Sequence, residues 1–264
     1  MPWVPHGISN GKLTAGWPKK PDGYFDGFPA AIDVIPQTNA TENAREAAAR
    51  CPTGAIDVGA DGITLDRGRC ILCRRCTTIA PGSFAIRRGS DTARVGRSAL
   101  VVGDVQENHE ALRLLRRSIA ERVRSLRQSI HIRHVDAGSD GSDEWEVQAL
   151  LNPVYDIHRL GIFITPSPRH ADILLVTGIG TEGMHEPLAR TRDGMPDPVV
   201  VIGVGADAAS GGLIGGGYTQ GLGIEPLVNV DVWVPGAPAT PFSILHGILL
   251  ALGRLQPRTG KEQP

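Results

Sequence analysis

The chain has 264 residues, which is enough for one large domain or two domains of ordinary size. A hydrophobic content of 41% and a charged content of 21% predict a soluble globular protein, and a formal net charge of −1 argues against a general nucleic-acid binder. No run of eighteen or more apolar residues predicts a transmembrane helix, and the first residues lack the apolar core of a signal peptide.

Residues 1–40 are rich in proline and glycine and show no sustained periodicity. We expect an extended arm that lies on a partner or on the rest of the chain. A disordered tail is the alternative, although the segment has more aromatic residues than disordered sequences usually have. These aromatic residues are Trp3, Trp17, Tyr24, Phe25 and Phe28.

All four cysteines lie in the first third of the chain, at Cys51, Cys70, Cys73 and Cys76. The bacterial ferredoxin motif is C-x2-C-x2-C-x3-C-P, and in two-cluster proteins its fourth cysteine binds the other cluster. This motif occurs twice, each time incomplete. The second copy has the cysteine triplet followed by Ala-Pro in place of Cys-Pro, and the first copy keeps only Cys51 and the proline after it.

The positions that lack cysteine form one complete ligand set. In the two-cluster pattern, Thr41, Ala44, Ala47 and Ala80 would hold the second cluster, and the four cysteines would hold the first. The segments CPTGAI and APGSFAI, at the ends of the two motifs, also resemble each other as in an internal duplication. We therefore predict one intact 4Fe–4S site in a small α+β domain, residues 41–104, that resembles a bacterial two-cluster ferredoxin.

Two other roles for the cysteines remain open. A zinc site usually takes its ligands from two separated pairs, not from a close triplet and a distant fourth residue. A disulfide framework is typical of short secreted chains, whereas thiols kept for a metal fit a reducing cytoplasm. Arg69, Arg74 and Arg75 lie beside the triplet. They would raise the reduction potential of a cluster, or they are solvated surface residues.

After a glycine-punctuated strand segment at residues 94–105, residues 105–129 predict a linker helix. Apolar side chains recur along it every three or four residues and form one stripe. This stripe consists of Leu112, Leu115, Ile119, Val123, Leu126 and Ile130. The opposite face is rich in arginine. Such a helix can lie on a membrane surface, but we favour a connector packed on a partner or on its own domain.

From residue 130 onward, short apolar segments ended by glycine or proline alternate with helical segments. The strand candidates are 129–138, 161–166, 171–178, 198–205 and 230–236, and the helix candidates are 144–152, 183–191 and 242–255. This alternation predicts a flavodoxin-like, doubly wound parallel α/β sheet over residues 130–256, with ligands at the carboxyl ends of its strands. The glycine-rich turns DAGSDGSD, GVGADAASGG and VPGAPATP fall at those ends.

Several segments of this domain follow one another as in a known family: HVDAGSDGSDEWE, NPVYDIHRLGI, SPRHADILLVTG, GADAASGG, VNVDVWVPGAPATP and HGILLALG. On these segments, residues 130–255 resemble the small subunit of membrane-bound, energy-converting (group 4) nickel–iron hydrogenases and the 20 kDa subunit of complex I. The resemblance implies a 4Fe–4S cluster held by four cysteines on the turns. It also implies electron relay to a large subunit, membrane proton-pumping subunits in the same complex, and a peripheral place on the cytoplasmic face of the cell membrane.

The chain departs from the family at all four of those ligand positions. Aligned on the flanking motifs, the positions fall on Asp140, Asp143, Asp207 and Ala237. Carboxylates are poor ligands for an iron–sulfur cluster, so we predict no cluster in the α/β domain. Three acids in one pocket must be solvated, partly protonated, paired with a base or bound to a hard divalent cation.

Other residues that match the family motifs remain. Glu144 and Glu146 correspond to acids that face the large subunit, so they resemble proton-path or interface residues. As early residues of a helix they would also favour its dipole. Residues 167–172 match the family's SPRHAD turn, which a partner contact or turn structure explains equally. The glycine-rich residues 211–223 lack the strand–GxGxxG–helix order of a nucleotide site.

The leading interpretation is an iron–sulfur electron-transfer subunit of a hydrogenase-like or complex I-like membrane-bound oxidoreductase. It would hold one 4Fe–4S cluster in the ferredoxin domain and have a second site without its cluster. Its residues would set the position, potential and access of the cluster and would not catalyse bond chemistry. The alternative is a redox-inert structural subunit of such a complex, whose aspartate-lined site binds a cation or lines a proton route.

Overall fold

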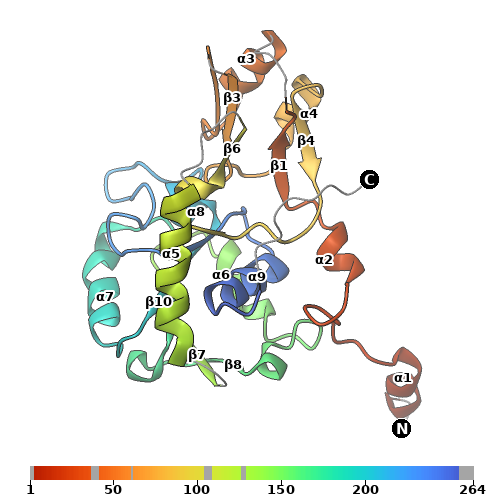
Figure 1. Cartoon of the computed structure of the whole chain (residues 1–264), viewed down its shortest axis with the longest axis vertical. Coiled ribbons are helices and arrows are strands. Elements are labelled where there is room, and N and C mark those ends of the chain that lie inside the picture. The colour runs from red at the N-terminus through yellow and green to blue at the C-terminus, as the bar shows by residue number, and fades with distance from the viewer. Residues whose placement is uncertain (1–2, 37–41, 61, 104–108, 126–128, 256–264) are drawn as a thin grey trace.

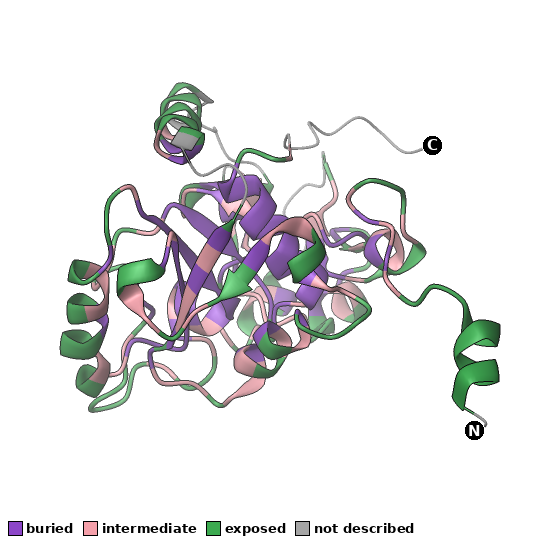
Figure 2. Ribbon diagram, turned by 90° about the horizontal axis from the view of Figure 1, so that it is seen from below, coloured by how far each residue is buried: buried purple, intermediate pink, exposed green. Residues whose placement is uncertain are grey.

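The computed structural model describes residues 3–36, 42–60, 62–103, 109–125 and 129–255. These residues form a smaller part, built from two antiparallel sheets, and a larger part built around a six-stranded sheet (Figure 1). The central strands of the larger part and the helix beside them are buried (Figure 2). Most of the hydrophobic core therefore lies in the larger part.

The six-stranded sheet has the order β5-β11-β10-β9-β7-β8. Its strands are β5 Arg94–Val95, β7 Ile130–Asp136, β8 Ile162–Ile164, β9 Ile173–Thr177, β10 Val200–Val204 and β11 Val232–Val234. The pairs among β7 to β11 are parallel, and the edge strand β5 runs antiparallel to β11. Counted from β7 along the chain, the parallel strands have the spatial order 2-1-3-4-5, which is the flavodoxin order. The predicted flavodoxin-like α/β fold is confirmed.

Helices cover both faces of this sheet. They are α5 His109–Arg122, α6 Ser142–Ala149, α7 Glu182–Asp193, α8 Gly205–Ser210 and α9 Pro241–Ala251, with 3-10 turns at Ser98–Leu100, Val123–Ser125, Ile157–Leu160 and Pro168–His170. Successive side chains of a strand point to opposite faces. Ile173 and Leu175 of β9 thus join the core under α5, α6 and α9, whereas Leu174 and Val176 join the core under α7 and α8. Burial of both faces explains why these strands are continuous apolar runs.

The helix α9 lies inside the molecule, and all eleven of its residues are buried. It is hydrophobic around its whole circumference, which is typical of a buried helix. A Cβ atom at Gly247 would lie 2.4 Å from Cγ2 of Val234, so the glycine allows the helix to pack closely on β11.

The smaller part contains β1 Ala31–Val34, β2 Ile56–Gly59, β3 Gly62–Asp66, β4 Phe84–Arg87 and β6 Val101–Gly103, with helices α3 Glu42–Ala49 and α4 Arg75–Ile79. The strands form the antiparallel sheets β2-β3-β6 and β1-β4. Ala44, Ala47 and Ala80 stand at three of the positions where the two-cluster pattern would have cysteines, and they are at most 3% exposed within its core. Thr41, the fourth position, lies outside the described residues.

Within the segment predicted as one strand region, residues 94–105, the described residues 94–103 divide between the two parts. Its first strand, β5, extends the large sheet beside β11, and its second strand, β6, pairs with β3. The chain therefore crosses between the parts before residue 104, and the proposed domain boundary there stays a prediction.

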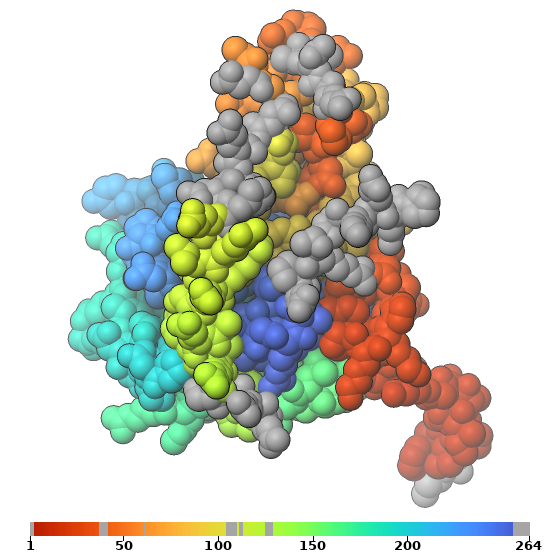
Figure 3. Space-filling view, viewed as in Figure 1, coloured from red at the N-terminus to blue at the C-terminus, as the bar shows by residue number. Residues whose placement is uncertain are grey.

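The described residues among the first forty have three different environments. The helix α1, Trp3–Asn10, is exposed along its whole length and extends away from the rest of the chain (Figure 3). Trp17 stacks on Phe25 of the short helix α2, Gly23–Gly27, with ring centroids 4.4 Å apart, and both rings contact Phe242 of α9. Strand β1 then belongs to the smaller part. The middle of the predicted arm thus lies on the α/β part.

The helix α5 packs on its own chain. Ile119 and Val123 of its apolar stripe are buried, and Arg122 pairs with Asp231 and donates to the backbone oxygen of Val199 (3.0 Å). The side chain of Leu112 and all of Leu126 lie outside what the structure describes. Within the described residues, no helix is both long and apolar enough to cross a membrane.

Candidate functional site

The cysteine triplet begins on a tightly wound loop before α4. Its last member, Cys76, lies in the first turn of α4. Leu72 and Arg74 have positive φ angles of 55° and 62°, a left-handed conformation that costs non-glycine residues about 1 to 2 kcal/mol each. The left-handed conformation of these two residues gives the loop its curvature. Ala80 N–H donates to the backbone oxygen of Cys76 (2.8 Å) and closes α4.

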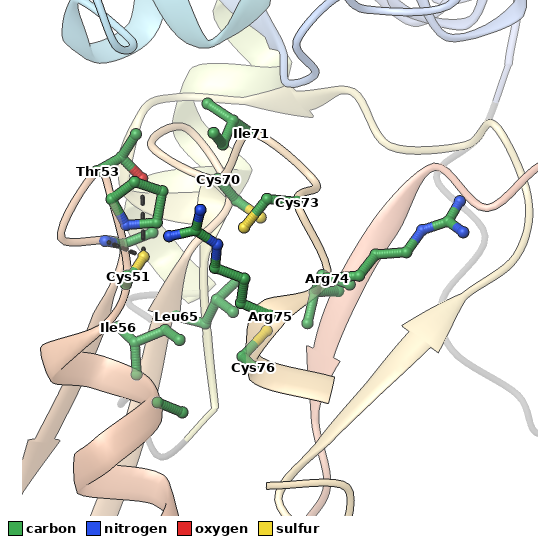
Figure 4. Close-up of a pocket in the computed structure, with 14 residues that line it drawn as sticks. Cys51, Thr53, Ile56, Leu65, Cys70, Ile71, Cys73, Arg74, Arg75 and Cys76 are labelled. Atoms are coloured by element: carbon green, nitrogen blue, oxygen red, sulfur yellow. Dashed lines mark hydrogen bonds between the residues drawn. The ribbon is translucent and has the colours of Figure 1, made fainter. Parts of the chain in front are cut away.

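The four cysteines line one cavity, although Cys51 comes from the turn after α3 and the triplet comes from the loop before α4 (Figure 4). Apolar side chains, among them Ile32, Ile56 and Leu65, form much of the rest of the lining. All four cysteines are free thiols, so the structure gives no support to a disulfide framework.

The surroundings of the sulfur atoms differ. The backbone N–H of Ala55 donates to Sγ of Cys51 (3.3 Å), whose sulfur also lies 3.8 Å from Oγ1 of Thr53. The pKa of Cys70 is raised to about 12, mainly by burial and also by the other three cysteines, against the lowering effect of the Leu72 backbone N–H. Burial also raises the pKa of Cys76, with smaller contributions from Cys73 and Cys51. This mutual influence follows from their position around one cavity.

No group of three or more His, Cys, Asp or Glu side chains within the described ranges has the spacing to hold a single metal ion. This finding gives no support to a mononuclear zinc site at the cysteines. It gives none either to a cation held by Asp140, Asp143 and Asp207.

The cysteine loop is fastened to the α/β part just before Cys70. Asp66, at the end of β3, accepts two hydrogen bonds from the Arg97 guanidinium (2.8 and 2.7 Å). Arg97 also donates to the backbone oxygen of Ala209 (3.1 Å), and Oγ of Ser210 donates to that of Gly68 (3.1 Å). Because α8 also carries Asp207, it connects the two candidate sites. The cysteine and turn motifs did not reveal this junction, since it depends on contacts between distant segments.

The second candidate site lies at the carboxyl ends of the strands, as the sequence predicts. Asp140 and Asp143 follow β7, Asp207 follows β10 in the first turn of α8, and Ala237 follows β11. The turn after β10 and the turn after β11 both contact the side chain of Asp143. The backbone N–H of Ala239 donates to its Oδ1 (2.8 Å). A Cβ atom at Gly205 would lie 1.9 Å from its Oδ2.

The sequence profile of the family described as NADH ubiquinone oxidoreductase, 20 Kd subunit, matches residues 141–251. The probable membrane-bound hydrogenase subunit mbhJ of Pyrococcus furiosus is 36% identical over 157 residues, which cover 60% of this chain and 94% of that protein. The chain belongs to this family. The resemblance read from the sequence is confirmed.

Other relatives of this 20 Kd subunit family member differ in coverage. Formate hydrogenlyase subunit 7 of Escherichia coli is 39% identical over 145 residues, 55% of this chain and 57% of that protein, so just over half of that relative is matched. The chain is also similar to a chain in a solved structure of the membrane-bound sulfane sulfur reductase, an archaeal respiratory membrane complex. The match covers 50% of this chain and 72% of that chain. Its TM-score is 0.44, with 27% identity.

In this member of the 20 Kd subunit family, the three aspartates of the second candidate site differ in their pKa values. The pKa of Asp143 is raised to about 8, mainly by burial and also by the charges of Asp207, Glu144 and Asp140, against the lowering effect of the Ala239 N–H. Burial, followed by Asp140 and Glu144, raises the pKa of Asp207 to about 6. The side chain and backbone N–H of Ser142 lower the pKa of the exposed Asp140. Of the arrangements foreseen for the acids, partial protonation fits Asp143.

The two glutamates of α6 lie beside this turn. Oε2 of Glu144 accepts from Oγ of Ser139 (2.7 Å), and its buried Oε1 has no hydrogen-bond partner among the described residues. Burial raises the pKa of Glu146, which is partly exposed. Ala237 is exposed and contributes no polar side chain. The arrangement can hold protons near neutral pH, but it offers no thiolate.

Proposed function

We propose that the chain is the electron-transfer subunit of a membrane-bound, hydrogenase-like or complex I-like oxidoreductase, with one 4Fe–4S cluster bound by Cys51, Cys70, Cys73 and Cys76. One observation carries this proposal: four free thiols from two separate segments line a single cavity. Four thiolates are the usual ligand set of such a cluster. We assign the cluster to the segment 41–104.

The position of the thiols supports this assignment. The four thiolates of a cluster bind four different irons, so they surround a shared space and not a single atom. The four described thiols line one cavity, as a cluster requires.

The residues around the thiols would control the properties of the bound cluster. When bound, the cluster supplies a centre that accepts and donates one electron. Ile32, Ile56 and Leu65 limit the access of water, and the N–H of Ala55 would stabilise negative charge on the Cys51 sulfur. Arg74 and Arg75 place positive charge at the cavity, which would favour the reduced form.

The α/β domain, which we place at residues 130–256 beyond a linker at 105–129, would dock the chain in its complex. Family membership supports a place in a membrane-bound complex. The partners that the resemblance implies are a large subunit and, through the complex, membrane proton-pumping subunits. We place the chain on the cytoplasmic face of the cell membrane. The acid turns would meet the large subunit, with Glu144 and Glu146 at that contact.

The test is the metal content of the full chain purified without oxygen. We expect about four irons per chain and a reducible 4Fe–4S spectrum. Cys51→Ser and Cys73→Ser should each lower the iron content, whereas Thr78→Ser, a control on the same loop and helix, should leave it unchanged. Zinc in place of iron would overturn the proposal, and about eight irons would mean that a second cluster has other ligands.

The alternative is a redox-inert structural subunit whose acid site lines a proton route. The pKa values of Asp143 and Asp207, raised to about 8 and about 6, favour it, because such groups exchange protons near neutral pH. A chain that contains no iron while its complex remains active would decide for this alternative.

A further inference from the structure

One side of the cysteine cavity opens to solvent. Cys73 is exposed, Cys76 is buried, and the other two cysteines are intermediate. An open groove of about 440 Å³ begins at Cys73 and is lined by Arg50, Cys73, Arg74, Arg75, Thr78 and Ile79. A group that approaches along this groove reaches the cysteine site without displacing any part of the core.

The groove is basic. Arg74 and Arg75 are exposed, and neither forms an ion pair with an acid in the described part of the chain. Arg50 pairs with Glu46 (2.8 Å), but both side chains are about half exposed, and such pairs contribute little. None of the side chains lining the groove is acidic. The chain as a whole has a net charge of −1, so this positive charge is local.

We propose that the basic groove formed by Arg50, Arg74 and Arg75 around Cys73 is the docking surface for a small acidic electron-carrier protein. The inference rests on the proposed cluster at the four cysteines. In the exchange, the reduced carrier loses one electron from its own iron–sulfur or flavin centre, and the four-cysteine site gains it. No bond forms, and no proton has to move.

Two observations favour a protein carrier over other anionic partners. The charge surrounds a groove that leads to the exposed cysteine, and electron exchange requires close approach at that point. A nucleic-acid partner would require a more extensive basic surface than these three arginines provide. Complementary charge raises the association rate of two proteins by about 10-fold to 1,000-fold at low salt.

The arginines could instead act only on the cluster, by raising its potential. The two roles differ in their dependence on salt. Docking charges at a solvent-exposed surface are screened over about 10 Å at moderate ionic strength, so the association rate must fall as salt is added. A purely local effect on the potential leaves the association rate unchanged.

The experiment compares the full chain with the double variant Arg74→Gln/Arg75→Gln. The control, Arg113→Gln/Arg117→Gln, removes the same charge from exposed positions of α5. The probe is an acidic plant-type 2Fe–2S ferredoxin, chemically reduced for stopped-flow measurements. A gallium-substituted, redox-inactive form of this ferredoxin serves for binding titrations. Iron content and reduction potential are measured for each preparation.

We expect the groove variant to keep its iron but to associate about tenfold more slowly at low salt, with a weaker salt dependence. The control should behave as the unaltered chain does. Equal rates for an iron-loaded groove variant and the unaltered chain would overturn the docking proposal and leave the cluster intact. The same conclusion follows if the unaltered chain binds anionic vesicles but not the ferredoxin. If the unaltered chain contains no iron, the proposed function fails instead, and binding of the gallium form still decides whether the groove docks an acidic protein.

Discussion

Replacing Asp143 by asparagine tests how a buried carboxyl holds together the turns at the carboxyl ends of the parallel strands. The Asp143 side chain is buried, at 2% exposure, and its Oδ1 accepts from the N–H of Ala239 (2.8 Å). Its pKa is raised to about 8, mainly by burial, so at pH 7 the folded protein holds this carboxyl largely protonated. Asparagine keeps the shape and the acceptor oxygen but cannot ionise.

The direction in which stability changes with pH follows from the pKa of Asp143 in the unfolded and in the folded chain. In the unfolded chain this carboxyl ionises near its ordinary pKa of 3.8, whereas the folded chain keeps the proton up to about pH 8. Between these values the folded state binds more protons, so stability falls as pH rises. A tenfold change in equilibrium corresponds to about 1.4 kcal/mol, so the penalty reaches about 5 kcal/mol near pH 8. We expect Asp143→Asn to remove it.

The measurement is urea-induced unfolding of both full-length proteins at several pH values between about 4 and 8. The difference in unfolding free energy should move in favour of Asp143→Asn by about 5 kcal/mol across this range. Asp140→Asn is the matched control. Because Ser142 lowers the pKa of Asp140, the stability that this carboxylate adds is lost only as pH falls below about 3.8, so Asp140→Asn should gain no stability relative to the unaltered protein between about pH 4 and 8. A parallel pH dependence for Asp143→Asn and the unaltered protein would refute the reasoning.

Three further substitutions test the packing around the sites. Asp33→Asn leaves the buried Arg67, at 6% exposure, without its carboxylate partner and should cost about 3 kcal/mol, whereas Arg67→Met leaves an aspartate that water can reach and should cost less. Urea midpoints of the two variants check this order, and the reverse order would contradict it. Gly205→Ala places a Cβ atom against the carboxyl of Asp143 at a φ of +91°, so it should cost about 2 kcal/mol or more, measured as a lower thermal midpoint. An unchanged midpoint would show that the turn can move aside.

The topology of the α/β part could be predicted because both faces of its sheet are buried, which leaves a clear alternation of apolar strands and helices. The helix α8 was missed, since GVGADAASGG contains mostly small residues and was predicted as a turn. Its Ala206, Ala208 and Ala209 are buried, so tertiary packing and not propensity stabilises the helix. The division of residues 94–105 between two sheets also depends on distant partners, β11 and β3, which no local pattern specifies.

For the candidate sites, spacing predicted which residues would meet but not their surroundings. The ferredoxin motif predicted that Cys51 would lie near the triplet, and the predicted ends of the parallel strands indicated that Asp143 would lie near Asp207. The sequence could not show that Arg50 shares a groove with Cys73, because that requires α3 and the triplet loop to be adjacent. It could not rank the pKa values of the aspartates either, since burial is the largest cause of the two raised values.

The arrangement around Asp143 joins the turns that follow three strands of the α/β part. A cluster ligated from the turns after β7, β10 and β11 would bind those three turns to one another. In this chain, one buried carboxyl contacts the same three turns: it lies on α6 after β7, accepts from Ala239 after β11, and packs on Gly205 after β10. A protonated carboxyl makes these contacts without burying a charge, which is the state that its raised pKa favours. An oxygen acceptor at position 143 therefore matters more than the acid itself, so Asp143→Ala should loosen the three turns that Asp143→Asn leaves joined.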